Sequence, residues 1–246
     1  MDSRYQPCLL RLSRTGNATA PQRTFFFRSK LLAVVFGLVS FLPFAAAAPP
    51  QAAIASAHPL ATEAGFEILE KGGNAFDAAV AISAALAVVE PAGSGLGGGG
   101  FWLLHRASDG KTVMLDGRER APLAARSDMY LDAKGKPVRD KSINGALSAG
   151  IPGLPAALVH LAENYGRLPL SADLAPAIRH AENGFPISAR HHRLLSFRAD
   201  VLRTSKAAAD IFLRDKEVPS IGTLLKQKDL ASTLRQMGKL GWAGFY

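Results

Sequence analysis

Apolar residues recur at helical spacing in two consecutive stretches of the chain. The first stretch begins at Pro59, a residue suited to the first turn of a helix, and ends at Gly72 and Gly73. The second follows Asn74, whose side chain can cap a helix, and from 75 to 89 almost every residue is apolar. We therefore expect two adjoining helices, the second of them buried on all sides.

Short runs of β-type residues lie on either side of these helices. Residues 101–106 and 112–116 are separated by a turn at 108–111, and together they predict a β-hairpin. Residues 52–57 are small and apolar and predict a buried strand.

Beyond Pro122 the pattern is mostly helical. In the third of the expected helices, Leu194, Phe197 and Val201 share one apolar stripe. The expected helices span residues 156–165, 174–183, 188–206 and 224–240. The whole pattern predicts an α+β protein in which helix predominates after Pro122.

The N-terminal residues have the pattern of a secretory signal peptide. An apolar run at 31–44 follows Arg28 and Lys30 and leads into small residues, with cleavage expected between Ala46 and Pro49. The run is shorter than the ~20 apolar residues that a membrane-spanning helix needs. We therefore expect residues 1–48 to be a leader and residues 49–246 to be an exported protein, periplasmic or secreted, that meets a membrane only through an uncleaved leader.

Composition and charge exclude several classes of function. The chain is 48% hydrophobic and 20% charged, as in ordinary globular proteins, and its formal net charge is +9. More than half of this surplus lies in residues 1–48, so the remainder gives little support for a nucleic-acid partner. Cys8, the only cysteine, lies in the leader, so the mature chain has no disulfide and no cysteine nucleophile.

Residues 93–100 form a glycine-rich loop that fits neither of the common nucleotide-binding motifs. A P-loop requires Lys and Ser or Thr after its glycines, whereas Phe101 and Trp102 follow here. A dinucleotide fingerprint runs strand, glycines, helix, and this loop joins a helix to a strand. We expect the glycines to let the buried helix and the hairpin pack closely.

Arg118, at the end of the second hairpin strand, is the best candidate for a functional side chain. A guanidinium binds a carboxylate through two parallel hydrogen bonds, which fix orientation as well as charge. The alternative is a surface ion pair of Arg118 with Asp116 or Glu119.

Other residues with possible chemistry give weaker signals. His191 and His192 point in different directions on a helix and are expected on a solvated basic face. His58 has no partner of a catalytic kind in the sequence, and Ser94 lacks the context of a nucleophile elbow. We assign none of them a catalytic role.

Four motifs together resemble the γ-glutamyltranspeptidase (glutathione hydrolase) family, and the resemblance runs from about Ala52 to Tyr246. The motifs are HPLATEAG from His58, GGNAFDAA from Gly72, VEPAGSGLGGGGF from Val89 and LDGRERAP from Leu115.

The resemblance implies a part of a four-layer αββα sandwich of the N-terminal nucleophile hydrolase type. It implies a self-processing precursor whose threonine nucleophile transfers the γ-glutamyl group of glutathione or related compounds to water or another acceptor. By the motif, Arg118 clamps the α-carboxylate of that group. No metal or organic cofactor is implied.

No threonine of this chain lies in the context that marks the family's cleavage site, so we expect no catalytic residue here. The nucleophile is expected beyond Tyr246, in a small subunit cut from the same precursor, and the 246-residue chain alone is expected to be inactive. Trp242, Phe245 and Tyr246 form an unusually aromatic terminus, which fits a truncated N-terminal part.

Two alternatives remain from the sequence. One is a related acylase or a poly-γ-glutamate-processing enzyme with the same fold, although Arg118 favours a substrate with an α-carboxylate. The other is a truncated, inactive relative that serves as a binding module.

Overall fold

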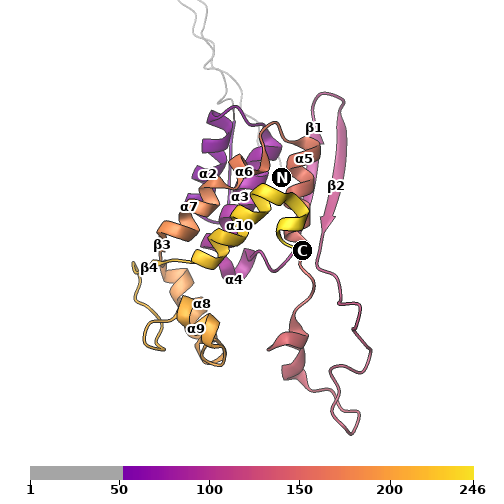
Figure 1. The fold of residues 1–246 in the computed structure, drawn as a ribbon, viewed down its shortest axis with the longest axis vertical. Coiled ribbons are helices and arrows are strands. Elements are labelled where there is room, and N and C mark those ends of the chain that lie inside the picture. Colours follow the sequence, from indigo (N-terminus) through magenta and orange to yellow (C-terminus); the bar gives the residue numbers. More distant parts are fainter. Residues whose placement is uncertain (1–51) are drawn as a thin grey trace, which may run out of the picture. The chain divides into compact units, whose positions relative to one another are not determined.

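The computed structural model describes residues 52–246, so the expected leader, residues 1–48, lies outside the described residues. Helices predominate, and the strands form two antiparallel pairs (Figure 1). The expectation of a mixed α+β chain is confirmed at this level. The helices are α2 (Pro59–Glu70), α3 (Ala75–Val89), α4 (Pro91–Ser94), α5 (Leu154–Tyr165), α6 (Leu170–Asp173), α7 (Ala175–Asn183), α8 (Ala189–Arg203), α9 (Lys206–Phe212) and α10 (Lys228–Leu240). The strands are β1 (Gly100–Arg106), β2 (Lys111–Gly117), β3 (Phe185–Pro186) and β4 (Leu224–Leu225), and short 3-10 turns are η1 (Arg139–Ser142), η2 (Ala146–Ser148) and η3 (Gly241–Gly244).

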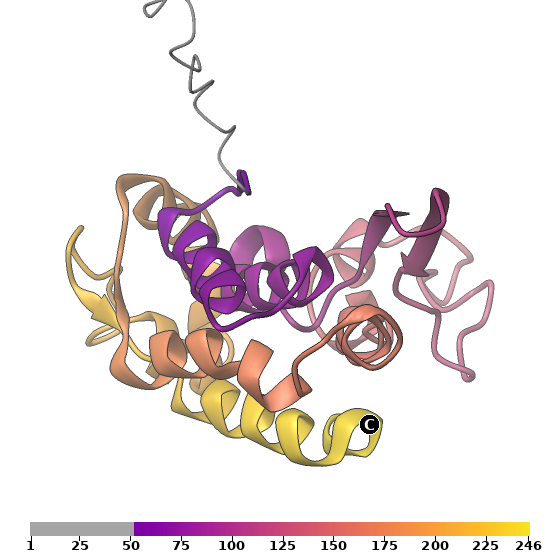
Figure 2. The same cartoon turned by 90° about the horizontal axis from the view of Figure 1, so that it is seen from above.

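Helix α3 is the central element of the core, as its composition predicts. It packs against α2, α5 and α7, and its small side chains allow these helices to approach closely (Figure 2). Val80, Ala84 and Val88 are fully buried, at the spacing of one helix face. The prediction of a helix buried on all sides is correct only in part, because Ala75 is exposed and Ala79, Ile82, Ser83 and Leu86 are half-buried.

The start of α3 is fixed by a capping box. The Asn74 side chain accepts hydrogen bonds from the N–H groups of Phe76 and Asp77, and the Asp77 carboxylate accepts one from the N–H of Asn74. The same Asp77 carboxylate accepts the N–H groups of Arg167 and Leu168 in the loop between α5 and α6. One buried side chain thus holds two segments together that are far apart in sequence.

The far end of α3 is tied to the start of α10 by Gln227. The buried Gln227 side chain donates from Nε2 to the carbonyl of Val88 at 2.8 Å, and its backbone N–H donates to the carbonyl of Ala181 at 2.8 Å. Carbonyls in the last turn of a helix have no partner within the helix, and Gln227 satisfies one of them.

Strands β1 and β2 form the expected hairpin, with Leu103 opposite Met114 and Phe101 opposite Asp116. Successive side chains alternate between the two faces of a strand. One face carries Trp102 and Leu115 and packs on the helices, whereas Phe101, Leu103 and Met114 on the other face are 56%, 70% and 59% exposed. The hairpin therefore has one packed face and one uncovered apolar face.

Several predicted elements are wrong or have shifted boundaries. Residues 52–57 form no strand and are half-buried or exposed, because among the described residues no strand pairs with them. The helix expected at 224–240 begins at Lys228, and Leu224 and Leu225 instead pair with β3. Residues between Pro122 and Gly153 are not helical apart from η1 and η2.

The expected helix at 188–206 is divided, and its buried stripe differs from the prediction. Helix α8 ends at Arg203, and α9 begins anew after the cap residue Ser205. The buried residues of α8 are His191, Leu195 and Ala199, whereas Phe197 is 83% exposed. The expected solvated position of His191 is therefore wrong, since its ring stacks on the buried Phe185 at 5.8 Å.

No helix within residues 52–246 is both long enough and apolar enough to span a bilayer.

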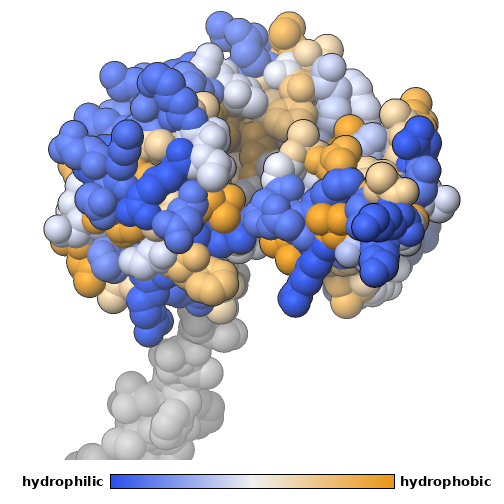
Figure 3. All heavy atoms as spheres, turned by 90° about the horizontal axis from the view of Figure 1, so that it is seen from below, coloured by the Kyte–Doolittle hydropathy of each residue, from blue (hydrophilic) through white to orange (hydrophobic). Residues whose placement is uncertain are grey.

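The face in Figure 3 mixes hydrophilic and apolar side chains, and apolar groups gather in the hollow at its centre.

Candidate functional site

The glycine-rich loop packs its backbone against the start of α5. The carbonyl of Gly98 accepts hydrogen bonds from the N–H groups of Gly153 and Leu154, both at 3.0 Å. A Cβ atom on Gly99 would lie 2.9 Å from the Cα of Arg118, and one on Gly153 would overlap the carbonyls of Gly117 and Arg118. Glycine is therefore required where three backbone segments meet. The expected close packing is present, but the segments that it joins are the loop, the end of β2 and the start of α5, and not the buried helix α3 and the hairpin.

Gly117 is the last residue of β2 and faces the helices. A Cβ atom there would lie 2.7 Å both from the Cβ of Ala157 and from the Trp102 ring. The indole occupies the space that a side chain at position 117 would need, and its Nε1 donates to the Ser83 hydroxyl at 3.3 Å. Since Gly117 faces inward, Asp116 and Arg118 project on the uncovered face of the hairpin.

The backbone turns out of β2 at Arg118. The N–H of Arg118 donates to Oδ1 of Asp116 at 2.9 Å, which is a local side-chain cap of the strand end. Two residues later, Arg120 and Ile151 exchange backbone hydrogen bonds of 3.0 and 2.8 Å. The Arg118 backbone is thus held on both sides while its side chain is exposed.

The Arg118 guanidinium makes no ion pair within residues 52–246, so the alternative pairing with Asp116 or Glu119 is absent there. A free guanidinium on a fixed backbone can bind a carboxylate with two hydrogen bonds, and little conformational entropy of the main chain is lost. Chemically, this strand end can orient an anion but offers no nucleophile.

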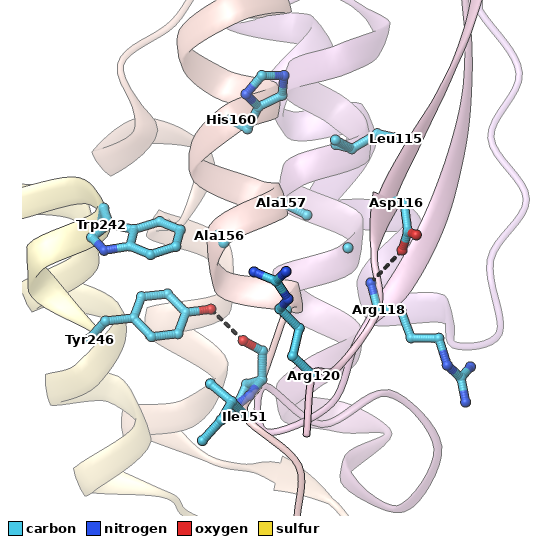
Figure 4. A pocket seen from close by; sticks show the side chains of 13 residues that line it. Leu115, Asp116, Arg118, Arg120, Ile151, Ala156, Ala157, His160, Trp242 and Tyr246 are labelled. Carbon is cyan, nitrogen blue, oxygen red and sulfur yellow. Dashed lines mark hydrogen bonds between the residues drawn. The ribbon is translucent and has the colours of Figure 1, made fainter. Parts of the chain in front are cut away.

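A pocket of about 450 Å³ lies on the packed side of the same strand end. Its walls come from β2 and the residues that follow it, the start of α5 and the segment around η3, and include Asp116, Arg118, Arg120, Trp242 and Tyr246. Figure 4 shows the Arg120 guanidinium pointing into this pocket, whereas the Arg118 guanidinium points away from it. The two guanidinium groups therefore point to opposite sides of the strand end, although Arg118 also contributes to the lining of the pocket.

Sequence reasoning missed Arg120 and the aromatic wall of the pocket. Trp242 and Tyr246 stack at 4.4 Å, and the Tyr246 hydroxyl donates to the carbonyl of Pro152 at 2.5 Å. Burial raises the pKa of Tyr246 above its usual value. The aromatic composition of residues 242–246 was the available signal, but it gave no indication of which segment these rings contact.

The histidines with no assigned chemistry in the sequence have structural roles. Nδ1 of His58 accepts the N–H of Leu60 at 3.2 Å and caps α2. The His191 ring is 6% exposed, and neither of its nitrogens has a hydrogen-bond partner in the described part of the chain. Burial lowers the pKa of His191, and the nearby Glu90 opposes this shift.

Within residues 52–246, no group of three or more His, Cys, Asp or Glu side chains is placed to bind a metal ion.

Comparisons with known proteins agree with these motifs. The profile of the gamma-glutamyltranspeptidase family matches residues 61–246. A glutathione hydrolase proenzyme of Bacillus subtilis is 40% identical over 195 residues, which are 78% of this chain and 33% of that protein. The crystal structure of Helicobacter pylori gamma-glutamyltranspeptidase matches with a TM-score of 0.76 at 43% identity. The match covers 80% of this chain and 58% of the Helicobacter pylori chain. A cephalosporin acylase from Bacillus halodurans is less similar, with a TM-score of 0.63 at 30% identity. The match covers 78% of this chain and 39% of the acylase chain.

The chain belongs to the γ-glutamyltranspeptidase family. It corresponds to an N-terminal part of such proteins and spans about a third of the length of the curated relatives it matches.

Proposed function

We propose that this chain supplies the carboxylate-binding part of an enzyme that transfers or hydrolyses the γ-glutamyl group of glutathione and related compounds. The observation that carries the proposal is the unpaired, exposed guanidinium of Arg118 on a backbone fixed by Gly99, Gly153 and Asp116. Membership of the family and the LDGRERAP motif support the proposal that this arginine binds the α-carboxylate of the substrate.

The substrate lies, in this proposal, on the uncovered face of the hairpin and not in the 450 Å³ pocket behind it. Arg118 projects from the face that carries Phe101, Leu103 and Met114. This sheet face is apolar, and the Arg118 guanidinium lies at its end. Such a surface suits a ligand with a carboxylate and an aliphatic chain.

The nucleophilic threonine and the oxyanion donors come from sequence beyond Tyr246, in the small subunit of the same precursor. The exposed apolar residues of the hairpin support this partner, because an uncovered apolar sheet face favours packing against further structure. Completion of the four-layer αββα sandwich on this face is part of the proposal.

Residues 1–48 act as a cleaved leader, and the enzyme works outside the cytoplasm. N-terminal sequencing of the mature protein tests this point. A mature terminus between Ala46 and Pro49 supports export, and an intact leader contradicts it.

The decisive experiment measures γ-glutamyl-p-nitroanilide hydrolysis by the full-length precursor and by its Arg118→Lys and Arg120→Lys variants. Lysine keeps the charge but loses the bidentate geometry, so R118K should raise KM about tenfold or more. R120K is the matched control, because Arg120 points into the pocket behind the strand, and it should leave KM unchanged.

Three outcomes separate the parts of the proposal. A processed wild-type enzyme that does not hydrolyse the anilide contradicts the γ-glutamyl activity, and hydrolysis of a side-chain-acylated β-lactam instead favours the acylase alternative. Equal KM values for R118K and wild type contradict the role of Arg118. Turnover by purified residues 49–246 alone contradicts the expectation that this part lacks a nucleophile.

A further inference from the structure

Asp173 is a buried carboxyl group without any visible partner. It is the last residue of α6, its exposed fraction is zero, and neither carboxyl oxygen has a hydrogen-bond partner within residues 52–246. A buried charge without a partner is costly, and such a group binds a proton instead.

The neighbour of Asp173 is a second buried carboxyl group, that of Asp77. The Asp77 oxygens accept the N–H groups of Asn74 at 2.6 Å, Arg167 at 2.9 Å and Leu168 at 3.2 Å, which stabilise its negative charge. Burial, together with this negative charge, raises the pKa of Asp173 to about 7. Two carboxyl groups therefore share one buried region, and only that of Asp77 accepts hydrogen bonds within residues 52–246.

No cation compensates for this pair from the helices that surround α6. Asp77 of α3 is the charged group that acts on Asp173. The other titratable groups of the packed elements occupy exposed or half-buried positions: Lys228, Asp229, Arg235 and Lys239 of α10, His160, Glu163 and Tyr165 of α5, Arg167 of the loop between α5 and α6, and Arg179, His180 and Glu182 of α7.

Helix α6 is in close contact with α10. A Cβ atom on Gly238 of α10 would lie 3.2 Å from the Cα of Ser171 in α6. Helix α10 leads directly into η3, and Trp242 and Tyr246 form a wall of the pocket behind Arg118. The position of α6 therefore affects the packing of the element that forms this wall.

We propose that Asp77 and Asp173 form a proton-dependent latch, in which α6 packs on α3 and α10 only while Asp173 keeps a proton. The proposal is independent of the γ-glutamyl activity.

The direction of the pH effect follows from proton binding. Docked Asp173 binds its proton more tightly than the same residue in an undocked α6, where the carboxyl titrates near its ordinary value. Docking therefore weakens as pH rises from about 4 to about 7, and it stays weak above this range, where docked Asp173 is itself ionised.

Hydrogen exchange tests the latch in the full-length precursor and in its Asp173→Asn variant. In the wild type, protection of α6 and α10 amides, corrected for intrinsic rates, should fall about tenfold or more between about pH 5 and about pH 7. In D173N, which has the shape of the protonated acid, this fall should be absent. Glu70→Gln, at an exposed position of α2, is the matched control and should behave like the wild type.

The same pH dependence of protection in D173N and wild type overturns the proposal. If D173N fails to fold, infrared spectroscopy of the wild type decides. A protonated carboxyl band that persists at about pH 6 and disappears above about pH 8 supports the latch, since exposed carboxyl groups are ionised at both values. Absence of this band at about pH 6 overturns it.

Discussion

The backbone carbonyl of Gly98 and the N–H of Gly153 are joined by a hydrogen bond of 3.0 Å that connects the glycine-rich loop to the start of α5. This contact encloses the peptide units of Gly117 and Arg118, so the Arg118 backbone is fixed by packing.

Replacement of Gly153 by Ala should lower the free energy of unfolding by about 1–3 kcal/mol, because the new methyl group overlaps the carbonyls of Gly117 and Arg118. Urea unfolding measures the effect. Gly97→Ala is the control within the loop, since nothing lies within 4 Å of its Cβ position. Equal losses in the two variants would contradict the role of Gly153 in this packing.

Replacement of Gln227 by Ala should cost about 1–3 kcal/mol of unfolding free energy, since the buried carbonyl of Val88 loses its donor. Gln236→Ala in the same helix changes an exposed side chain and should have little effect. Thermal or urea unfolding of both variants provides the comparison. A Gln227 variant as stable as the Gln236 variant would show that the tie between α3 and α10 contributes nothing.

Replacement of Leu103 and Met114 by Thr should increase the solubility of residues 49–246, which we expect to be low. The double variant removes two exposed apolar side chains and keeps β-forming residues on the strands. Light scattering at increasing protein concentration measures aggregation. Leu104→Thr alters a side chain that is 6% exposed and should instead destabilise the fold. A sharp, reversible thermal transition of the unmodified chain would count against the expected aggregation.

Replacement of His191 by Leu should remove part of the acid sensitivity of the fold. Burial lowers the pKa of His191 in the folded state, so the unfolded chain binds the proton more tightly and stability is lost as pH falls through about 6.5. The urea midpoint of H191L relative to that of the wild type should therefore be higher at about pH 5 than at about pH 7.5. A constant difference for H191L would exclude a contribution from protonation.

Local signals in the sequence were sufficient for the elements that form the centre of the fold. Pro59 begins α2 and Asn74 caps α3, and the turn predicted at 108–111 lies at 107–110, where it joins β1 to β2. Such features are predictable because capping, backbone restriction and turn chemistry act over a few residues. Close packing at the glycine-rich loop is also predictable, since a missing side chain has a direct steric meaning, but the start of α5 as its partner is not.

The failures concern contacts between distant segments. Nothing within α8 distinguishes the buried His191 from the exposed Phe197, because Phe185 determines which face is covered. Arg120 differs from Arg118 only through the turn that follows Gly117 and the pairing of Arg120 with Ile151. The role of Arg118 in substrate binding remains a prediction.

The pairing of Arg120 with Ile151 brings together the two ends of the segment between them, which contains η1 and η2. The entropic cost of loop closure grows slowly with length, by only about 0.6 kcal/mol for each doubling of the number of residues. This segment can therefore accept an inserted peptide, such as an affinity tag or a reporter, while the strand end that carries Arg118 keeps its geometry. The same property makes it a segment in which length can change during evolution at little cost in stability.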